Sequence, residues 1–207
     1  MNYIRITKEN IDREHICCAM SGKQSLAKKE WMKQRFDEGL VFYRSEERGK
    51  CFIEYIPAEN AWVPIDADGY LYIDCLWVSG SMKGHGYAND LLDECLRDAG
   101  EQGRKGVCIL CAEGRKREFL ADPGFLAYKG FRTADVSDCG ITLMYLPPYA
   151  ERRPSEIQGL RQTPAGGRGR FCSLLHGSVP VHLLLGGAGA GGRKRTCDPL
   201  QGHSHYR

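Results

Sequence analysis

The segment with the clearest chemical potential is Ser79–Tyr87, SGSMKGHGY, which lies between an apolar run and an amphipathic run. Glycines allow the backbone to approach a ligand closely, and the backbone amides at the start of a helix attract negative charge. Lys83 adds a positive charge to the same segment. These features together predict an anion site that could accept a pyrophosphate.

Three kinds of phosphate-binding loop share these features, and residue spacing separates them. A nucleotide P-loop ends in Gly-Lys-Ser/Thr after four spacer residues, which this segment lacks. A dinucleotide fingerprint needs a third glycine where Asn89 stands. The third kind is the pyrophosphate loop of the GNAT acetyltransferases, written R/Q-x-x-G-x-G/A. Lys83–Ala88, KGHGYA, resembles that pattern except at its first position, where Lys83 replaces Arg or Gln.

The resemblance to the GNAT family covers residues 2–146. A second segment, Phe119–Phe131, FLADPGFLAYKGF, is similar to a bacterial subgroup, the YoaP-like N-acetyltransferases. The resemblance implies an α/β fold with a mixed, mostly antiparallel sheet, flanking helices, and fourth and fifth strands that splay apart. It also implies that acetyl-CoA is the co-substrate and lies in the gap between those strands. The implied cofactor-binding residues are Leu76, Trp77 and Val78 for the pantetheine, and Lys83, Gly84, His85, Gly86, Tyr87 and Ala88 for the pyrophosphate.

In this family an amine attacks the thioester carbonyl directly, so the resemblance implies catalysis without a covalent enzyme intermediate. Asp74 is the candidate base, because many relatives carry an acidic residue four positions before the residue that matches Val78. Strand alternation predicts that Asp74 shares one face with Leu76 and Val78. Tyr128 is the candidate acid, although Leu126 occupies the position where relatives carry their tyrosine. Structural roles remain open as alternatives. Asp74 could pair with a neighbouring residue, Tyr128 could serve only in packing, and Lys83 could be merely solvated.

The elements expected to position these residues follow from hydrophobic periodicity. We expect helices over Ile11–Met20, over Ser25–Glu38, over 88–99, and after Asp122-Pro123, where an N-cap precedes a proline. The predicted strands are Asn2–Ile6, Val41–Arg44, Cys51–Pro57, Leu71–Val78, Gly106–Ala112, Phe131–Val136 and Ile141–Leu146. The predicted order is therefore β-α-α-β-β-β-α-β-α-β-β, and the sheet is complete by Leu146.

Composition divides the chain near Pro147-Pro148. Residues 1–150 carry 20 Lys and Arg against 23 Asp and Glu, whereas residues 151–207 carry 9 against 3 and hold 11 of the 25 glycines. We expect an N-acetyltransferase domain over 1–148 and a disordered or poorly packed basic tail over 149–207. When the tail is back-translated with freely chosen codons and read one base later, it can resemble the thioredoxin-like extension of YoaP-like proteins. A frame-shifted remnant of that extension is therefore one hypothesis for the tail.

The remaining features argue against several other classes. No run of 18 apolar residues and no signal-peptide core is present, so we expect no membrane association. The ten cysteines lack regular spacing and are expected to be reduced thiols in the cytoplasm. Cys108 and Cys111 lie in a predicted strand and should point to opposite faces, so we expect no metal site there. Few aromatic residues accompany the arginines of the tail, so nucleic acid is not an expected partner.

We therefore predict an acyltransferase that acetylates a small-molecule or peptide amine. Its acceptor and its oligomeric state are not fixed by the sequence. Two other function classes stay open: an acyl-CoA-binding sensor or scaffold without efficient catalysis, and a thiol-redox protein.

Overall fold

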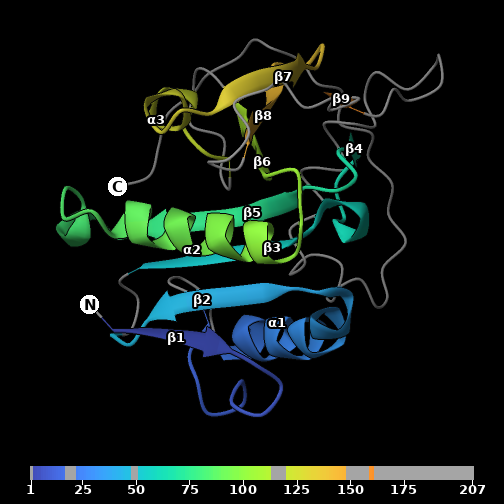
Figure 1. Ribbon diagram of the computed structural model, residues 1–207. Coiled ribbons are helices and arrows are strands. Elements are labelled where there is room, and N and C mark those ends of the chain that lie inside the picture. Colours follow the sequence, from blue (N-terminus) through green and yellow to red (C-terminus); the bar gives the residue numbers. More distant parts are fainter. Residues whose placement is uncertain (1, 17–21, 48–50, 113–119, 148–158, 161–207) are drawn as a thin grey trace, which may run out of the picture.

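A computed structural model describes residues 2–16, 22–47, 51–112, 120–147 and 159–160 of the 207-residue chain (Figure 1). The helices are α1 (Gly22–Arg35), α2 (Tyr87–Glu101) and α3 (Pro123–Tyr128), with short 3-10 turns η1 (Phe36–Glu38), η2 (Ala58–Asn60) and η3 (Gly80–Met82). The strands are β1 (Tyr3–Ile6), β2 (Val41–Ser45), β3 (Cys51–Pro57), β4 (Ile65–Asp66), β5 (Leu71–Val78), β6 (Val107–Ala112), β7 (Arg132–Val136), β8 (Ile141–Leu146) and β9 (Gly159–Leu160).

Seven of these strands form one sheet in the order β1-β2-β3-β5-β6-β8-β7. Every neighbouring pair is antiparallel except β5 and β6, which are the fourth and fifth strands across the sheet. Their parallel pairing joins only Leu71–Ile73 to Val107–Ile109, after which the two strands diverge (Figure 1). The predicted mixed, mostly antiparallel sheet with splayed fourth and fifth strands is confirmed.

Two apolar cores lie on opposite faces of this sheet. The α1-side core includes Trp31 and Met32 of α1, and the α2-side core includes five buried residues of α2: Leu91, Leu92, Cys95, Leu96 and Ala99. These α2 positions recur every three to four residues, which is the spacing that places side chains on one helix face. Helices therefore cover both faces, and each core holds alternate residues of the same strands.

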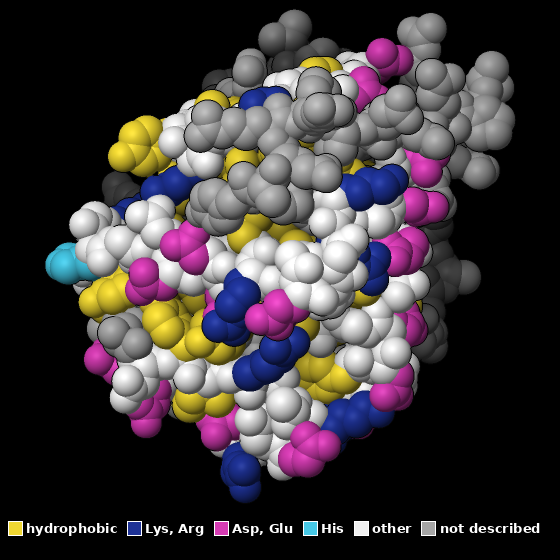
Figure 2. Space-filling view, viewed as in Figure 1, with side chains coloured by type: hydrophobic (Ala, Val, Ile, Leu, Met, Phe, Trp, Pro, Cys, Tyr) yellow, Lys and Arg dark blue, Asp and Glu magenta, His cyan; other side chains and the backbone are white. Residues whose placement is uncertain are grey.

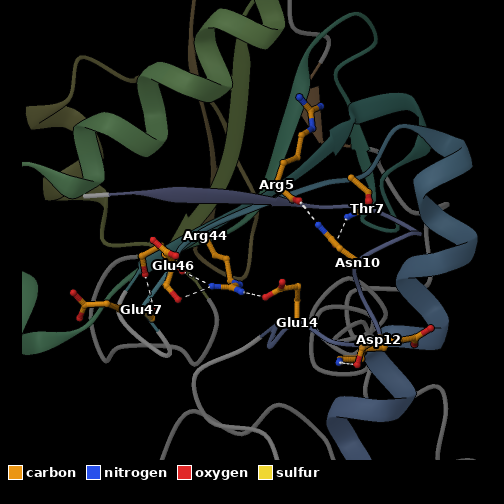
Figure 3. A network of polar contacts seen from close by, with 10 residues as sticks. Arg5, Thr7, Asn10, Asp12, Glu14, Arg44, Glu46 and Glu47 are labelled. Atoms are coloured by element: carbon orange, nitrogen blue, oxygen red, sulfur yellow. Dashed lines mark hydrogen bonds and ion pairs between the residues drawn. The ribbon is translucent and has the colours of Figure 1, made fainter.

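The predicted helix over Ile11–Met20 is wrong for residues 11–16, which form a turn, a bend and irregular backbone, and its last four residues lie outside the described part. The side chains of Ile11 and Ile16 are buried in the α1-side core, so burial rather than helical spacing fixes this segment. Polar contacts fasten it to the strands (Figure 3). Asn10 accepts a hydrogen bond from the Thr7 amide and donates one to the Arg5 carbonyl, while the buried Arg44 forms an ion pair with Glu14.

Of the predicted tail over 149–207, the structure describes only the strand β9. It pairs antiparallel with β4, with Leu160 opposite Ile65 and Gly159 opposite Asp66. These two residues therefore form a small second sheet with β4, the strand that precedes β5 in the chain. The rest of the tail lies outside the described residues.

Candidate functional site

The candidate site begins where β5 separates from β6. Ile73 is the last residue of β5 paired with β6, so the β6-facing edge from Asp74 to Val78 has no partner among the described strands. On its other edge, β5 pairs with β3 through a bulge: Ile73 lies opposite Tyr55 and Cys75 lies opposite Glu54. Asp74 is therefore the extra residue of a β-bulge at the point where the sheet opens.

This bulge changes which side chains share a face. Tyr72 belongs to the α1-side core and Asp74 lines a pocket beside it, whereas Leu76 and Val78 pack against the α2-side core. The prediction that Asp74 shares a face with Leu76 and Val78 is wrong, because one extra residue reverses the alternation of a strand. Trp77 is 41% exposed. The strand thus presents Asp74 to one side of the sheet and Leu76 and Val78 to the other.

The glycine-rich loop follows on the α2 side and forms an open turn before α2. Gly84 and Gly86 have φ angles of +83° and +84°, and Gly86 is the N-cap residue of α2, with no side-chain cap. The first amides of a helix have no partner within the helix, so those of Tyr87 and Ala88 are available to a ligand. A Cβ atom at Gly84 or Gly86 would meet no protein atom within 4 Å. The structure thus brings the predicted residues 83–88 together in one accessible turn.

Two side chains of this turn are themselves exposed. Lys83 extends from the segment between η3 and α2, and the His85 ring stacks on the Tyr87 ring with centroids 5.9 Å apart. The His85 Nδ1 atom lies 3.1 Å from the Lys83 carbonyl oxygen. Figure 2 shows hydrophobic surface between charged side chains on the face where Figure 1 places α2. The turn therefore offers a formal positive charge and helix amides to an anion from outside the molecule.

A pocket lies on the α1 side of the same stretch of β5. Its walls come from α1, from the turn after it, from β3, from the segment after η2 and from β5, and the lining residues are Trp31, Arg35, Leu40, Ile56, Ala61, Trp62, Val63, Tyr72 and Asp74. The pocket is open: about 340 Å³ of empty space lies within it and in the solvent at its mouth. We name these nine residues the aromatic pocket. Sequence reasoning identified only Asp74 as a functional residue among them.

Charged groups around Asp74 control its protonation. Burial raises the pKa of the Asp74 carboxyl, the nearby Glu54 carboxylate adds to this rise, and Lys28 and Arg35 oppose it. Together these effects bring the pKa from its ordinary 3.8 to about 7. Glu54 and Lys28 are both buried and form an ion pair of 2.5 Å. At neutral pH Asp74 therefore exchanges a proton readily, which is the property that a general base or acid needs.

Arg35 is held in the wall of the aromatic pocket by several partners. Its guanidinium carbon lies 4.7 Å from the ring centroid of Trp62 and 5.6 Å from that of Trp31. Its two terminal nitrogens donate to the Glu38 carboxylate and to the Asn60 carbonyl. Trp31 and Arg35 lie four apart on α1, a helical spacing that could have indicated their shared position, whereas nothing around Trp62 in the sequence indicated its role.

Tyr128 lies elsewhere. It is the last residue of α3 and 83% exposed, with the Lys129 ammonium 4.9 Å from its ring centroid. Leu126, which stands at the relatives' tyrosine position, is fully buried in the α2-side core. Tyr128 is not among the residues that line the aromatic pocket, so the structure does not bring it together with Asp74.

The described cysteines are mostly buried. They are Cys51, Cys95, Cys108 and Cys111, which are buried, and Cys75 and Cys139, which are partly exposed. Cys108 lies in the α1-side core and Cys111 in the α2-side core, which confirms that they point to opposite faces. Within the described ranges, no cluster of three or more His, Cys, Asp or Glu residues could hold a metal ion. In the same ranges, no helix is long and apolar enough to span a membrane.

Comparison with known proteins gives one curated relative. No family model matches the chain. The chain is 46% identical over 169 residues to the uncharacterized N-acetyltransferase YoaP of Bacillus subtilis (strain 168), an alignment that covers 80% of this chain and 63% of the relative. This relative confirms the resemblance to YoaP-like proteins. The chain spans less than two thirds of the relative's length.

The chain is also similar to solved structures of low sequence identity. Ribosomal-protein-alanine N-acetyltransferase from Brucella melitensis matches with a TM-score of 0.49 and 13% identity, covering 71% of this chain and 99% of that one. The PaiA N-acetyltransferase from Thermoplasma acidophilum, solved in complex with coenzyme A, matches with a TM-score of 0.46 and 13% identity, covering 71% and 99%.

Proposed function

We propose that this chain, a relative of an N-acetyltransferase, transfers an acetyl group from acetyl-CoA to a primary amine. The observation that carries the proposal is the opening of the sheet directly after Ile73, with the glycine-rich turn on one side and the aromatic pocket on the other. Asp74 stands at the opening. A two-substrate reaction needs such an arrangement, because both substrates must reach one point from different sides.

The chain's own features fit acetyl-CoA. A diphosphate can approach the turn at 83–88 because Gly84 and Gly86 leave open space, and the uncapped start of α2 favours its charge. Lys83 adds a positive charge there. The free edge of β5 from Leu76 to Val78 offers backbone groups to the amide groups of pantetheine, as one strand offers them to another. Acetyl-CoA supplies the activated acetyl group.

Asp74 is the group that we propose removes the proton from the amine, directly or through water. In the overall reaction the C–N bond of the amide forms and the C–S bond of the thioester breaks. The amine loses a proton to Asp74 and the departing thiolate gains one. Tyr128 is 83% exposed, so it can donate that second proton only if substrate binding changes its surroundings. Bulk water is the simpler proton donor.

The test is a screen with acetyl-CoA and a panel of amines, read by mass spectrometry of the products. A mass gain of one acetyl group on an amine, dependent on the protein, would support the proposal. Binding of acetyl-CoA without any acetylated product would instead assign the chain to the acyl-CoA-binding modules. Absence of binding at millimolar acetyl-CoA would overturn the assignment of the turn at 83–88.

A further inference from the structure

We propose that Trp31 and Arg35 select acceptor amines that carry a carbonyl or carboxylate oxygen beside the amine. This inference rests on the proposed function and deepens it by naming the acceptor class. It starts from two hydrogen-bond donors. In the described part of the chain, the indole Nε1 of Trp31 and the guanidinium Nε of Arg35 are buried and have no hydrogen-bond partner. Both residues line the aromatic pocket.

These donors belong to side chains that solvent hardly reaches. Trp31 is 8% exposed and Arg35 is 3% exposed. A buried N–H group without a partner destabilises a protein, so native structures satisfy nearly all of them. An indole N–H and a guanidinium N–H can only donate. The atom that satisfies them is therefore an acceptor, such as an oxygen of a ligand or of water.

The fold brings these donors to the side of the sheet where the proposed base lies. Trp31 and Arg35 are four residues apart on α1, so they share one helix face. The Arg35 guanidinium carbon lies 5.6 Å from the Trp31 ring centroid, close enough for one ligand group to contact both side chains. Asp74 lines the same pocket, and the charge of Arg35 acts on its carboxyl. An amine held at Asp74 would therefore have its next polar group near Trp31 and Arg35.

A carbonyl or carboxylate oxygen matches this pair of donors. Such an oxygen has two lone pairs and can accept from both N–H groups at once. The two terminal nitrogens of Arg35 already donate to the Glu38 carboxylate and the Asn60 carbonyl, so Nε is the guanidinium nitrogen that lacks a partner. Its bond to an oxygen would be charge-assisted and therefore strong. One oxygen needs only the room of a single water molecule.

The experiment compares kcat/KM at saturating acetyl-CoA for small amines of similar size. Glycinamide and glycine carry a carbonyl and a carboxylate beside the amine, and methallylamine has a carbon–carbon double bond in the same place. The values are extrapolated to the fully deprotonated amine, because the oxygen also lowers the pKa of the amine. At least one of the two oxygen-bearing amines should exceed methallylamine by about 10- to 100-fold, since methallylamine leaves both donors unpaired.

The ratio of glycinamide to glycine then shows whether the preferred oxygen is uncharged or charged. Equal values for all three amines are expected if water satisfies the donors. Such a result, or a preference for methallylamine, would overturn the inference and leave the proposed function intact.

Variants assign the preference to the two donors. Trp31→Phe removes one N–H and keeps an aromatic ring, so the preference over methallylamine should fall about tenfold. Arg35→Lys keeps the charge, removes Nε and should also reduce the preference. Trp62→Phe is the matched control, because Trp62 lines the same pocket but is 49% exposed, so its N–H can meet water. Its preference should equal that of the wild type. An unchanged preference in Trp31→Phe would contradict the inference.

A binding measurement makes the test independent of turnover and of the folding of Trp31→Phe. The chain has three tryptophans, and the NMR signal of the Trp31 indole N–H is identified by elimination with Trp62→Phe and Trp77→Phe. Glycinamide or glycine should move this signal downfield in the wild-type chain, and methallylamine should not.

This measurement also separates the inference from the proposed function. If the Trp31 signal responds to an oxygen-bearing amine but no amine is acetylated, the pocket assignment stands and the acetyl-transfer proposal fails. If amines are acetylated but the signal responds equally to methallylamine, the pocket assignment fails and the proposed function stands. No response and no acetylation would overturn both.

Discussion

Asp74 stands at an irregular point of β5. Alternation from Tyr72 places its side chain beside the aromatic pocket, and the bulge opposite Glu54 and Tyr55 turns Leu76 and Val78 to the other face. The unpaired β6-facing edge starts at the same residue. A single irregularity therefore separates the proposed base from Leu76 and Val78 at the point where the sheet opens.

Replacing this carboxyl tests its role directly. Asp74→Asn should lower kcat by about 10²–10⁴-fold at neutral pH, because a positioned base contributes a factor of that order. The wild-type rate should rise as pH passes about 7, where Asp74 loses its proton, and the variant should lack this rise. Pre-steady-state and pH-rate measurements check both expectations.

The control for this variant is Asp68→Asn, an exposed aspartate in the turn before β5, which should keep the wild-type rate. A pH profile of Asp74→Asn that still rises near 7 would show that another group is the base. The charged groups that set the position of the rise are Glu54 on β3 and Lys28 and Arg35 on α1, and the neighbouring Tyr72 hydroxyl stays uncharged there because burial and Asp74 raise its pKa.

The same raised pKa has a consequence for stability. Because the folded chain holds the pKa of Asp74 at about 7, above its ordinary 3.8, the folded state binds more protons than the unfolded state between these pH values. The contribution of Asp74 to the free energy of unfolding is therefore greatest below about pH 4, and it is lost as the pH rises through 7. Asp74→Asn should melt above the wild type at pH 8, and the difference should shrink at pH 4. Thermal denaturation of both proteins at pH 4 and pH 8 checks this. An Asp74→Asn variant that melts below the wild type at pH 8 would contradict it.

For single residues, the sequence predicts site residues that lie close together in the chain and misses those that only folding brings together. Asp74 and residues 83–88 follow from motifs within one strand, turn and helix. Trp31, Arg35 and Trp62 join Asp74 only after α1 and the segment following η2 pack beside β5, and no sequence pattern states that contact. The bulge was equally hidden, because the run Leu71–Val78 shows unbroken β character.

The start of α2 is the element on which we predict acetyl-CoA binding to depend. Gly86→Ala should abolish the rise in melting temperature caused by acetyl-CoA, since the added Cβ would project into the open space that the ligand needs. A ligand at about 100 times its Kd stabilises a protein by about 2.7 kcal/mol, so the lost shift is easily measured.

Gly140→Ala is the matched control for Gly86→Ala. Gly140 also has a positive φ, +74°, and its Cβ would also meet no atom within 4 Å, but it lies in the turn between β7 and β8. Both variants should lose similar intrinsic stability from backbone strain, and only Gly86→Ala should lose the response to acetyl-CoA. Equal responses in the two variants would remove the turn from the binding site.

Elements with strong local patterns are predicted closely. The bounds of β3, β5 and β8 agree with those expected from their apolar runs, and α3 starts after Asp122, whose side chain accepts a hydrogen bond from the Phe125 amide. The helix predicted over residues 11–16 is absent because the two isoleucines of this segment enter the core from non-helical backbone. There, a few isolated turn hydrogen bonds, such as the one from the Glu14 amide to the Asn10 carbonyl, and the Arg44–Glu14 ion pair hold the backbone.

For the molecule as a whole, the seven-stranded sheet sets the extent of the proposed acetyltransferase unit. The seven-stranded sheet is complete at Leu146, and the described tail residues add only the two-residue pairing of β9 with β4. A chain ending after residue 148 should therefore fold and keep the acetyl-CoA-induced shift of the full chain. A second chain ending after Leu160 separates the contribution of β9, which should raise the melting temperature slightly.

Loss of cooperative unfolding in the shorter chain would show that residues after 148 belong to the domain.

The frame-shift hypothesis needs a separate measurement. The gene should contain an open reading frame one base later, near codon 150, that encodes a Cys-Pro-x-Thr segment. Stop codons in that frame within a few residues of codon 155 would refute it.

The strand order also determines which strands can pair while the chain is being synthesised. β1, β2, β3 and β5 are antiparallel neighbours in chain order, so they can pair before the ribosome has delivered α2. The α1-side core is still incomplete then, because Cys108, Leu110 and Leu143 come from β6 and β8. Until β6 emerges, Leu71–Ile73 forms an apolar open edge of the kind that pairs with other chains. A nascent chain paused before Val107 should therefore need chaperone protection that the finished protein does not.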